Sequence, residues 1–220
     1  MRLDNRLSLV ASFVRHGSRI ADIGTDHAYL PVWLVNQNIC PSAIATDIRT
    51  GPSERAANNI KIAGLESKIS VRLGNGLDPV APFETDDIII AGMGGETIAG
   101  ILDSAPWTKD TGFRLILQPM TKPDFLHEFL LTNGYWIDRE QIAVDGKRLY
   151  PVIRAVYNPE NASAQAQLPA AFIIGGLDVQ RDRLYFEKQR ERLMNAAAAM
   201  RRAGKIKDAE TAEKLCALLA

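Results

Sequence analysis

The sequence predicts an α/β fold in which helices cover both faces of a parallel sheet. Three observations predict it: strand-like apolar runs alternate with helix-like segments up to residue 132, the run over 87–91 is apolar almost throughout, and a glycine turn follows the first run. A continuous apolar run is typical of a strand that is buried on both faces. The 220 residues, of which 46% are hydrophobic, are enough for one such domain and a small appendage.

The elements of this domain follow a regular order. Apolar residues at helical spacing predict an N-terminal helix over 3–15. Strands are expected at 19–23, 42–47, 69–73, 87–91 and 113–117. Helices are expected at 28–36, 52–63, 95–103 and 123–132. Strands that alternate with helices predict a parallel sheet.

The pattern changes after residue 134. Two extended segments, 135–144 and 150–157, are joined through Asp145-Gly146, a strong signal for a hairpin turn. The sheet is therefore expected to end in an antiparallel hairpin, and residues 158–169 are expected to form a polar linker. Beyond the linker we expect a long helix with a partial heptad over 177–203.

A shorter helix over 208–219 is expected to fold back on this long helix as a helical hairpin, similar to a coiled coil. These segments predict two domains, 1–157 and 168–220.

The first strand ends in an acidic, glycine-containing turn. Asp22 and Gly24 come at the point where open α/β sheets bind nucleotides, and glycine lets a ligand approach the backbone closely. Asp47 ends the second strand, about 20 positions further on, where a carboxylate can accept from both hydroxyls of a ribose. A simple turn glycine and a helix cap at Asp47 are the alternatives. We expect Asp22, Gly24 and Asp47 to bind a nucleoside-containing cofactor.

Two later turns supply further candidates at the same edge. Asn75 and Gly76 follow the third strand, and an asparagine can both donate to and accept from an adenine edge. An ordinary Asn-Gly turn explains this pair equally well. Gly92 and Met93 begin a segment in which three of four residues are glycines, which permits close approach to a ligand. Core packing of Met93 is an equal alternative.

Composition excludes several classes of protein. The two cysteines are far apart and the three histidines form no metal-binding pattern, so we expect reduced thiols and no metal. No apolar run is long enough to span a membrane, and no apolar segment follows the charged N-terminus as in a secretory signal. A cytoplasmic location is expected, with no membrane partner.

Net charge is zero, but the basic residues are concentrated near the C-terminus. Residues 181–207 contain nine Lys or Arg and three acidic residues. This predicts a contact with a polyanion such as RNA, and a solvated helix face is an equal alternative. The candidate contacts are Arg181, Arg183, Arg190, Arg192, Arg201 and Arg202, with Arg6 as a further candidate.

Several of these segments together resemble the bacterial tRNA (adenine-22-N1)-methyltransferase family. The resemblance is carried by 21–31 (ADIGTDHAYLP), 74–77 (GNGL), 91–95 (AGMGG), 118–119 (QP) and 145–153 (DGKRLYPVI). It implies a class I methyltransferase (Rossmann-like) sheet with the terminal antiparallel β-hairpin, and a helical appendage. It also implies S-adenosylmethionine as the methyl donor and a ring nitrogen of adenine in tRNA as the acceptor.

The first turn departs from the general pattern of class I methyltransferases, which is an acid followed by three alternating glycines. Asp26 and Ala28 replace the second and third glycines. Asp26 is the candidate catalytic residue, placed either beside the reacting ring, where it would stabilise the developing cation, or beside the ammonium group of the donor; capping the next helix is its alternative. His27 is a secondary candidate for binding the donor or RNA, with ordinary packing as its alternative.

Tyr29 could stack on a flipped base, although core packing is expected to be its main role. Many enzymes that methylate the exocyclic amine of adenine carry Asn/Asp-Pro-Pro-aromatic after the fourth strand. That motif is absent here, which favours a ring nitrogen. A methyltransferase of small molecules and a non-catalytic RNA-binding adaptor are the alternative functions.

Overall fold

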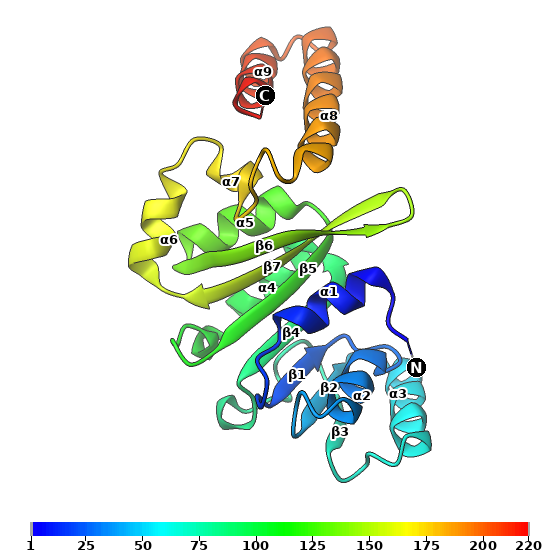
Figure 1. Ribbon diagram of the computed structural model, residues 1–220. Coiled ribbons are helices and arrows are strands. Elements are labelled where there is room, and N and C mark those ends of the chain that lie inside the picture. The colour runs from blue at the N-terminus through cyan, green and yellow to red at the C-terminus, as the bar shows by residue number, and fades with distance from the viewer. Residues whose placement is uncertain (1, 220) are drawn as a thin grey trace.

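The computed structural model of the protein describes residues 2–219, and its centre is a mixed seven-stranded sheet in the order β3-β2-β1-β4-β5-β7-β6 (Figure 1). The strands β1 to β5 are parallel to one another, and β7 is antiparallel to both β5 and β6. Their bounds are β1 (Ile20–Ile23), β2 (Ala43–Asp47), β3 (Ile69–Leu73), β4 (Asp87–Gly94), β5 (Arg114–Thr121), β6 (Tyr135–Asp145) and β7 (Arg148–Tyr157). The predicted parallel sheet and its terminal hairpin are confirmed.

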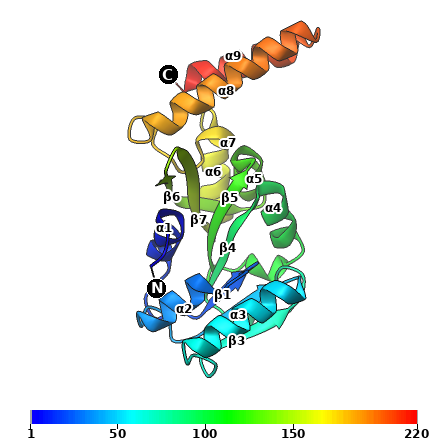
Figure 2. The same ribbon diagram turned by 90° about the vertical axis from the view of Figure 1, so that its right-hand side faces the viewer.

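Helices cover both faces of the sheet (Figure 2). The α-helices are α1 (Asn5–Phe13), α2 (Tyr29–Asn36), α3 (Thr50–Ile62), α4 (Gly95–Asp103), α5 (Pro123–Thr132), α6 (Pro159–Ala166), α7 (Ala171–Ile174), α8 (Arg183–Arg202) and α9 (Ile206–Leu218). Buried residues of α1, α2 and α3 form the core on one face, and those of α4, α5 and α6 form the core on the other.

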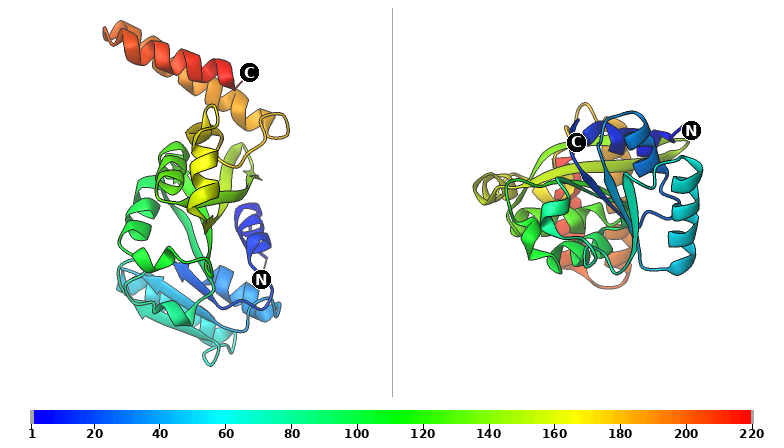
Figure 3. Two further views of the ribbon diagram at one scale, coloured as in Figure 1. Left: turned by 90° about the vertical axis from the view of Figure 1, so that its left-hand side faces the viewer. Right: turned by 90° about the horizontal axis from the view of Figure 1, so that it is seen from below.

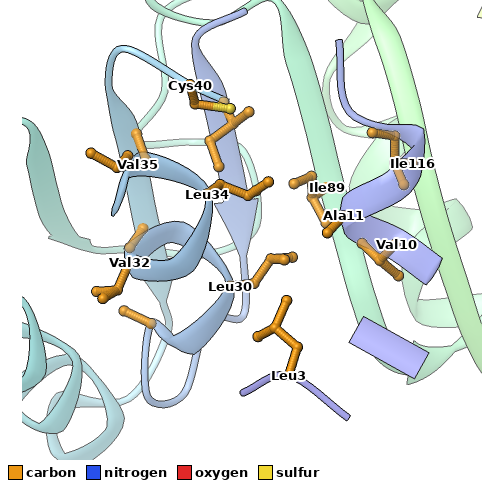
Figure 4. Close-up of a cluster of buried hydrophobic side chains, with 14 of the residues drawn as sticks. Leu3, Val10, Ala11, Leu30, Val32, Leu34, Val35, Cys40, Ile89 and Ile116 are labelled. Atoms are coloured by element: carbon orange, nitrogen blue, oxygen red, sulfur yellow. The ribbon is translucent and has the colours of Figure 1, made fainter. Parts of the chain in front are cut away.

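The strand β4 shows why an unbroken apolar run was needed. Ile89 packs into the core beneath α1 and α2, whereas Ile88 and Ile90 point to the opposite core, and all three are fully buried. Figure 4 shows Ile89 among side chains of α1 and α2, including Leu34 and Ala11. Burying each such side chain contributes about 1.5–3 kcal/mol, so this central strand fixes the layers of the fold.

The direction in which successive strands are added to the sheet changes between β1 and β4. From β1 the sheet continues outward to β2 and β3, and after β3 the chain returns to place β4 on the other side of β1. Open α/β sheets bind ligands in the crevice outside the carboxyl ends of the strands at such a reversal. The turns after β1, β2, β3 and β4 therefore define the edge where a ligand site is expected.

Three expectations about local structure were wrong. The expected linker 158–169 contains α6, whose N-terminus is capped by the Asn158 side chain accepting from the Asn161 amide at 3.1 Å. The strand β4 continues to Gly94, because its pairing with β5 shifts register around Met93 instead of ending. The long helix begins at Arg183 and not at 177, and Leu184 of its expected heptad is 58% exposed. Pairing with a strand distant in sequence decided only the extension of β4.

The helices α8 and α9 form a hairpin that projects beyond the sheet and its covering helices (Figure 3). Small residues pack between the two helices: Ala197, Ala209 and Ala212. At its base, Tyr185 and Phe186 pack with Leu177 next to the β6–β7 hairpin. The expected helical hairpin is confirmed.

A buried ion pair lies near the base of this hairpin. The ring of His127 is fully buried, with Nε2 3.0 Å from Glu140 Oε1 and Nδ1 3.1 Å from the Phe172 carbonyl. Burial alone lowers the pKa of His127, but the charge and hydrogen bond of Glu140 together with the Phe172 carbonyl raise it overall. The pair joins α5, β6 and α7 in one arrangement.

Candidate functional site

A hollow of about 520 Å³ opens at the carboxyl ends of β1, β2 and β4. We call it the large hollow. Among the predicted site residues, it is lined by Gly24, Asp26, Asp47, Asn75, Gly76, Gly92 and Met93. Its volume lies in the range of small-molecule sites, roughly 300–1,000 Å³. The predicted turns thus converge on one site, although they are up to 69 positions apart, from Gly24 to Met93.

The turn after β1 forms the floor of this hollow. Gly24 adopts a φ of +75°, and its amide and that of Thr25 both donate to the Thr46 carbonyl at 2.8 and 2.9 Å. A Cβ on Gly24 would overlap the methyl group of Met93. The backbone conformation therefore favours glycine at this position, and any other residue would also displace the end of the flexible Met93 side chain.

Asp47 lies at the end of β2 with a free carboxylate oxygen. Its Oδ1 accepts from the Arg49 amide at 2.8 Å, and within residues 2–219 its Oδ2 has no hydrogen-bond partner. The side chain does not cap α3, whose N-cap position is Arg49. A buried acceptor with one oxygen left open is suited to a ligand with hydroxyl groups.

The turn after β3 closes the opposite wall. Gly76 has a φ of +53°, and its carbonyl accepts from the Thr46 hydroxyl at 3.3 Å. A Cβ on Gly76 would lie 3.0 Å from a methyl group of Ile101, so the helix α4 approaches this turn closely. Asn75 also lines the hollow.

A second hollow of about 270 Å³ adjoins the first. We call it the small hollow. The two share Gly24, Asp26, Ala91 and Gly92, and the small one adds Arg6, Asp22, His27 and Tyr29 among its lining residues. Asp22 and His27 were expected to share one site with the residues of the large hollow. They line the small hollow instead.

The carboxyl group of Asp22 is buried. Burial raises its pKa to about 6, although the Thr25 hydroxyl, which donates to it at 2.6 Å, and the nearby charge of Arg6 both act in the opposite direction. Burial of an incompletely compensated carboxylate is costly, and a cationic ligand group would relieve that cost.

Asp26, the candidate catalytic residue, is ion-paired within the protein. Arg55 Nη2 donates to Asp26 Oδ1 at 2.8 Å, and Asp26 Oδ2 lies 3.6 Å from His27 Nε2. The hydrogen bond from Arg55 lowers the pKa of Asp26, so this side chain is ionised at neutral pH. It does not cap α2, since the N-cap position is Ala28 and receives no side-chain hydrogen bond. An ionised Asp26 can stabilise a cation, and its lowered pKa makes it a weak general base.

The expectation that Tyr29 packs in the core was wrong. The residue is 45% exposed and lines the small hollow. Its ring stacks on that of His27, with ring centres 5.0 Å apart and an angle of 8° between the planes. Residue type alone could not show this, because an aromatic at the start of a helix commonly faces the core.

Sequence reasoning missed several residues of the site. Gln118 is fully buried; its Oε1 accepts from Arg6 Nη1 at 2.8 Å and from the Gly92 amide at 3.2 Å. Arg6, expected as a phosphate contact, thus reaches the small hollow from α1. Ile48, Thr97 and Ile101 also line the large hollow. Two of them carried a usable signal: Ile48 directly follows the strand-ending Asp47, and Gln118 belongs to the 118–119 motif of the family.

The six candidate arginines near the C-terminus differ in their partners. Arg181 pairs with Asp182 and Arg183 with Glu187, each at 2.6–2.7 Å, while Arg192 lies 3.3 Å from Asp124. Arg201 makes two hydrogen bonds to Glu213, at 2.9 and 2.8 Å. Within the described part of the chain, no carboxylate lies within ion-pair distance of Arg190 or Arg202.

Comparison with known proteins decides the family. Residues 3–153 match the family model described as a methyltransferase domain. The chain is 33% identical over 212 residues to the tRNA (adenine(22)-N(1))-methyltransferase of Bacillus subtilis, covering 96% of this chain and 89% of that protein. The chain belongs to this methyltransferase family. The resemblance based on its motifs is confirmed.

Solved structures agree in fold. The crystal structure of the B. subtilis M1A22 tRNA methyltransferase TrmK has a TM-score of 0.91 at 30% identity, covering 99% of this chain and 98% of that one. A Streptococcus pneumoniae relative described as a putative tRNA (m1A22) methyltransferase, in complex with S-adenosyl-L-methionine, has a TM-score of 0.81 at 33% identity, covering 96% and 99%. The class I methyltransferase sheet and the helical appendage are therefore both features of the family.

Two further findings concern metals and membranes. Among residues 2–219, no three His, Cys, Asp or Glu side chains come together as the ligands of a metal ion would. Over the same residues, none of the helices combines the length and the apolar character that a membrane span requires.

Proposed function

We propose that this protein transfers a methyl group from S-adenosylmethionine to N1 of the adenine at position 22 of tRNA. One structural observation carries the proposal: the large and small hollows adjoin and share the wall formed by Gly24, Asp26, Ala91 and Gly92. A methyl transfer needs separate sites for donor and acceptor with a common boundary. The names of the family's relatives supply the particular acceptor.

The large hollow fits the donor. The open Oδ2 of Asp47 would accept from ribose hydroxyls, and Asn75 would meet the adenine edge. Gly24, in the wall shared by both hollows, leaves room for the methionine part, and the ammonium group of that part would reach past this wall to the Asp22 carboxylate in the small hollow. Four of the predicted binding residues, Asp22, Gly24, Asp47 and Asn75, thus have a matching group on the donor.

The methyl transfer requires the protein mainly to align the two reactants and to stabilise the charge that develops. When bound, S-adenosylmethionine supplies a methyl group on a sulfonium, which is reactive towards nucleophiles. Because N1 of neutral adenine holds a lone pair, no residue needs to remove a proton before attack. The shared wall would hold the two reactants in line at a near-attack distance. Asp26, ionised and next to both hollows, would stabilise the positive charge that develops on the ring.

The helical hairpin is the proposed RNA contact. Arg190 and Arg202 are the strongest candidates, because the other four arginines are already paired with carboxylates of the protein. Arg6 is assigned to the small hollow, where it would meet the acceptor nucleotide rather than the distant tRNA backbone. Phosphate contacts of this kind give affinity that falls with rising salt concentration.

Incubation with unmodified tRNA and S-adenosylmethionine tests the proposal. Nucleoside mass spectrometry should detect 1-methyladenosine, and a matched tRNA in which the adenine at position 22 is replaced by guanine should remain unmethylated. Methylation of both tRNAs would contradict the assigned position. Binding of the donor without methylation of any tRNA would instead favour a small-molecule methyltransferase or an adaptor.

A further inference from the structure

The turn after β1 contains two residues in backbone conformations that are unfavourable for any residue with a Cβ. Asp26 and Ala28 adopt φ values of +44° and +55°, in the left-handed region that residues with a Cβ seldom enter. Such conformations persist only where the surroundings impose them, and they concentrate at functional sites. The conformation of this turn therefore depends on contacts from another element.

Two side chains of α3 hold the turn from the same side. Arg55 Nη2 donates to the Asp26 carboxylate at 2.8 Å, and Asn59 Nδ2 donates to the His27 carbonyl at 2.9 Å. The two residues are four positions apart, so they project from one face of the helix. One contact fixes a side chain of the turn and the other fixes its backbone.

Neither residue belongs to the packing face of α3. That helix is anchored through Pro52, Ser53, Ala56 and Ile60, which are buried, whereas Arg55 is exposed and Asn59 is partly exposed. Their contacts with the turn are thus separable from the folding of the helix. A stability role in the core does not account for them.

The turn held in this way presents two rings to the small hollow. His27 and Tyr29 stack face to face, and Tyr29 keeps 45% of its surface exposed. Base–aromatic stacking is the usual means by which proteins hold an extruded nucleobase. Because His27 lies between the two strained residues, any relaxation of the turn would move its ring relative to Tyr29.

We propose that Arg55 and Asn59 are positioning residues which hold the 25–28 turn so that the stacked rings of His27 and Tyr29 form the wall against which the acceptor adenine stacks. This inference rests on the proposed function for the identity of the base. It assigns a role to α3 that is distinct from binding the donor. Disturbing the clamp should therefore impair use of tRNA and leave donor affinity intact.

Matched variants on neighbouring positions of α3 test the clamp. Asn59→Asp keeps the shape of the side chain but cannot donate to the His27 carbonyl, and Asn58→Asp adds the same charge at an exposed neighbour. We expect amide hydrogen exchange over 25–29 to be at least tenfold faster in the first variant than in the second. Equal exchange in the two variants would overturn the clamp, whatever the enzyme methylates.

Steady-state methylation and calorimetric donor binding test the wall. We expect Asn59→Asp and Tyr29→Leu each to lower kcat/KM for tRNA about tenfold or more, with a donor Kd within twofold of the wild type. Tyr29→Phe, which retains an aromatic ring, should stay within threefold of the wild type. A loss of donor affinity in Asn59→Asp, or equal activity of Tyr29→Leu and Tyr29→Phe, would refute this role.

The wild-type protein separates this inference from the proposed function. If it methylates tRNA but these variants behave like Asn58→Asp, the positioning role fails while the proposed function stands. If it methylates no tRNA, both the proposed function and the acceptor wall fail, and hydrogen exchange still decides the clamp by itself.

Discussion

Buried acidic residues have different partners at the two ends of the parallel strands. At the amino end, Asp87 is fully buried and accepts from the Arg15 amide at 2.8 Å and from its Nε at 2.6 Å. At the carboxyl end, Asp22 accepts from the Thr25 hydroxyl and Asp47 from one backbone amide. At the amino end an arginine donates directly to the acid, whereas at the carboxyl end the cations are further away: Arg6 acts on Asp22 only through its nearby charge, and Arg49 Nε lies 3.8 Å from Asp47 Oδ1.

This difference separates stability from function. Buried charges are costly unless they are well paired, and acids with only weak partners in the protein are suited to binding a ligand. The amino end joins the chain after α1 to the start of β4 through Arg15 and Asp87. The carboxyl end keeps its carboxylates for a ligand. Changes at the two ends should therefore affect different measurements.

The largest expected effect is on folding, at the amino end. Asp87→Ala removes the carboxylate that accepts from the Arg15 amide and from its guanidinium, which is 38% exposed, and losing these charge-assisted hydrogen bonds costs about 3 kcal/mol. Urea unfolding should show this loss in the free energy of unfolding, while donor affinity of the folded fraction stays unchanged. A loss below about 1 kcal/mol would mean that pairing of the acid at the amino end does not stabilise the fold.

The next effect is on donor affinity, at the carboxyl end. Asp47→Asn keeps an acceptor for the Arg49 amide but removes the charge offered to the ribose. We expect the Kd for S-adenosylmethionine to rise about 100-fold, which corresponds to about 2.7 kcal/mol, as measured by calorimetry. The free energy of unfolding without ligand should change by less than about 0.5 kcal/mol. Unchanged affinity would remove Asp47 from the donor site.

Asp22→Asn should stabilise the protein in the absence of ligand. Since burial raises the pKa of Asp22 to about 6, above its ordinary value of 3.8, the folded state carries a costly charge at neutral pH. We expect the variant to be more stable by about 2 kcal/mol above pH 6. As the pH falls from 6 towards 4, the folded wild type takes up the proton first and the difference disappears. Thermal melting at pH 7.5 and pH 4 checks this.

A loss of stability in Asp22→Asn at pH 7.5 would contradict that sign. Donor affinity of the same variant should fall, because an amide cannot compensate an ammonium group. A variant that is both more stable and a weaker binder would show directly that the carboxyl end gives up stability for function.

The smallest effects are expected in the helical hairpin. Arg202 has no carboxylate partner among residues 2–219, whereas Arg201 is held by Glu213. Arg202→Gln should weaken tRNA binding about threefold and reduce the slope of log affinity against log salt by about 1. Arg201→Gln should affect the slope less. Equal slopes in both variants would show that pairing within the protein does not decide which arginines meet RNA.

The sequence was sufficient for the sheet and for the position of most residues of the candidate site. The apolar run of β4, the Asp-Gly hairpin turn and the strand-ending Asp22 and Asp47 depend on local preferences and on periodicity, which one chain displays directly. Parallel strands then bring their carboxyl-end turns to one edge, so Gly24, Asp47 and Gly76 could be expected in a single site before any coordinates were known.

Tertiary structure alone decided which side chains act together across that edge. The hydrogen bonds of Arg55 and Asn59 to the 25–28 turn, the reach of Arg6 to Gln118 and the exposure of Tyr29 join segments whose spacing carries no pattern. The helix α6, by contrast, carries a local signal in the Asn158 cap and Pro159, which the polar composition of the segment obscured. Periodicity reports which face of an element is buried, but the partner of a polar side chain depends on where other elements pack, and that is fixed only when the whole core forms.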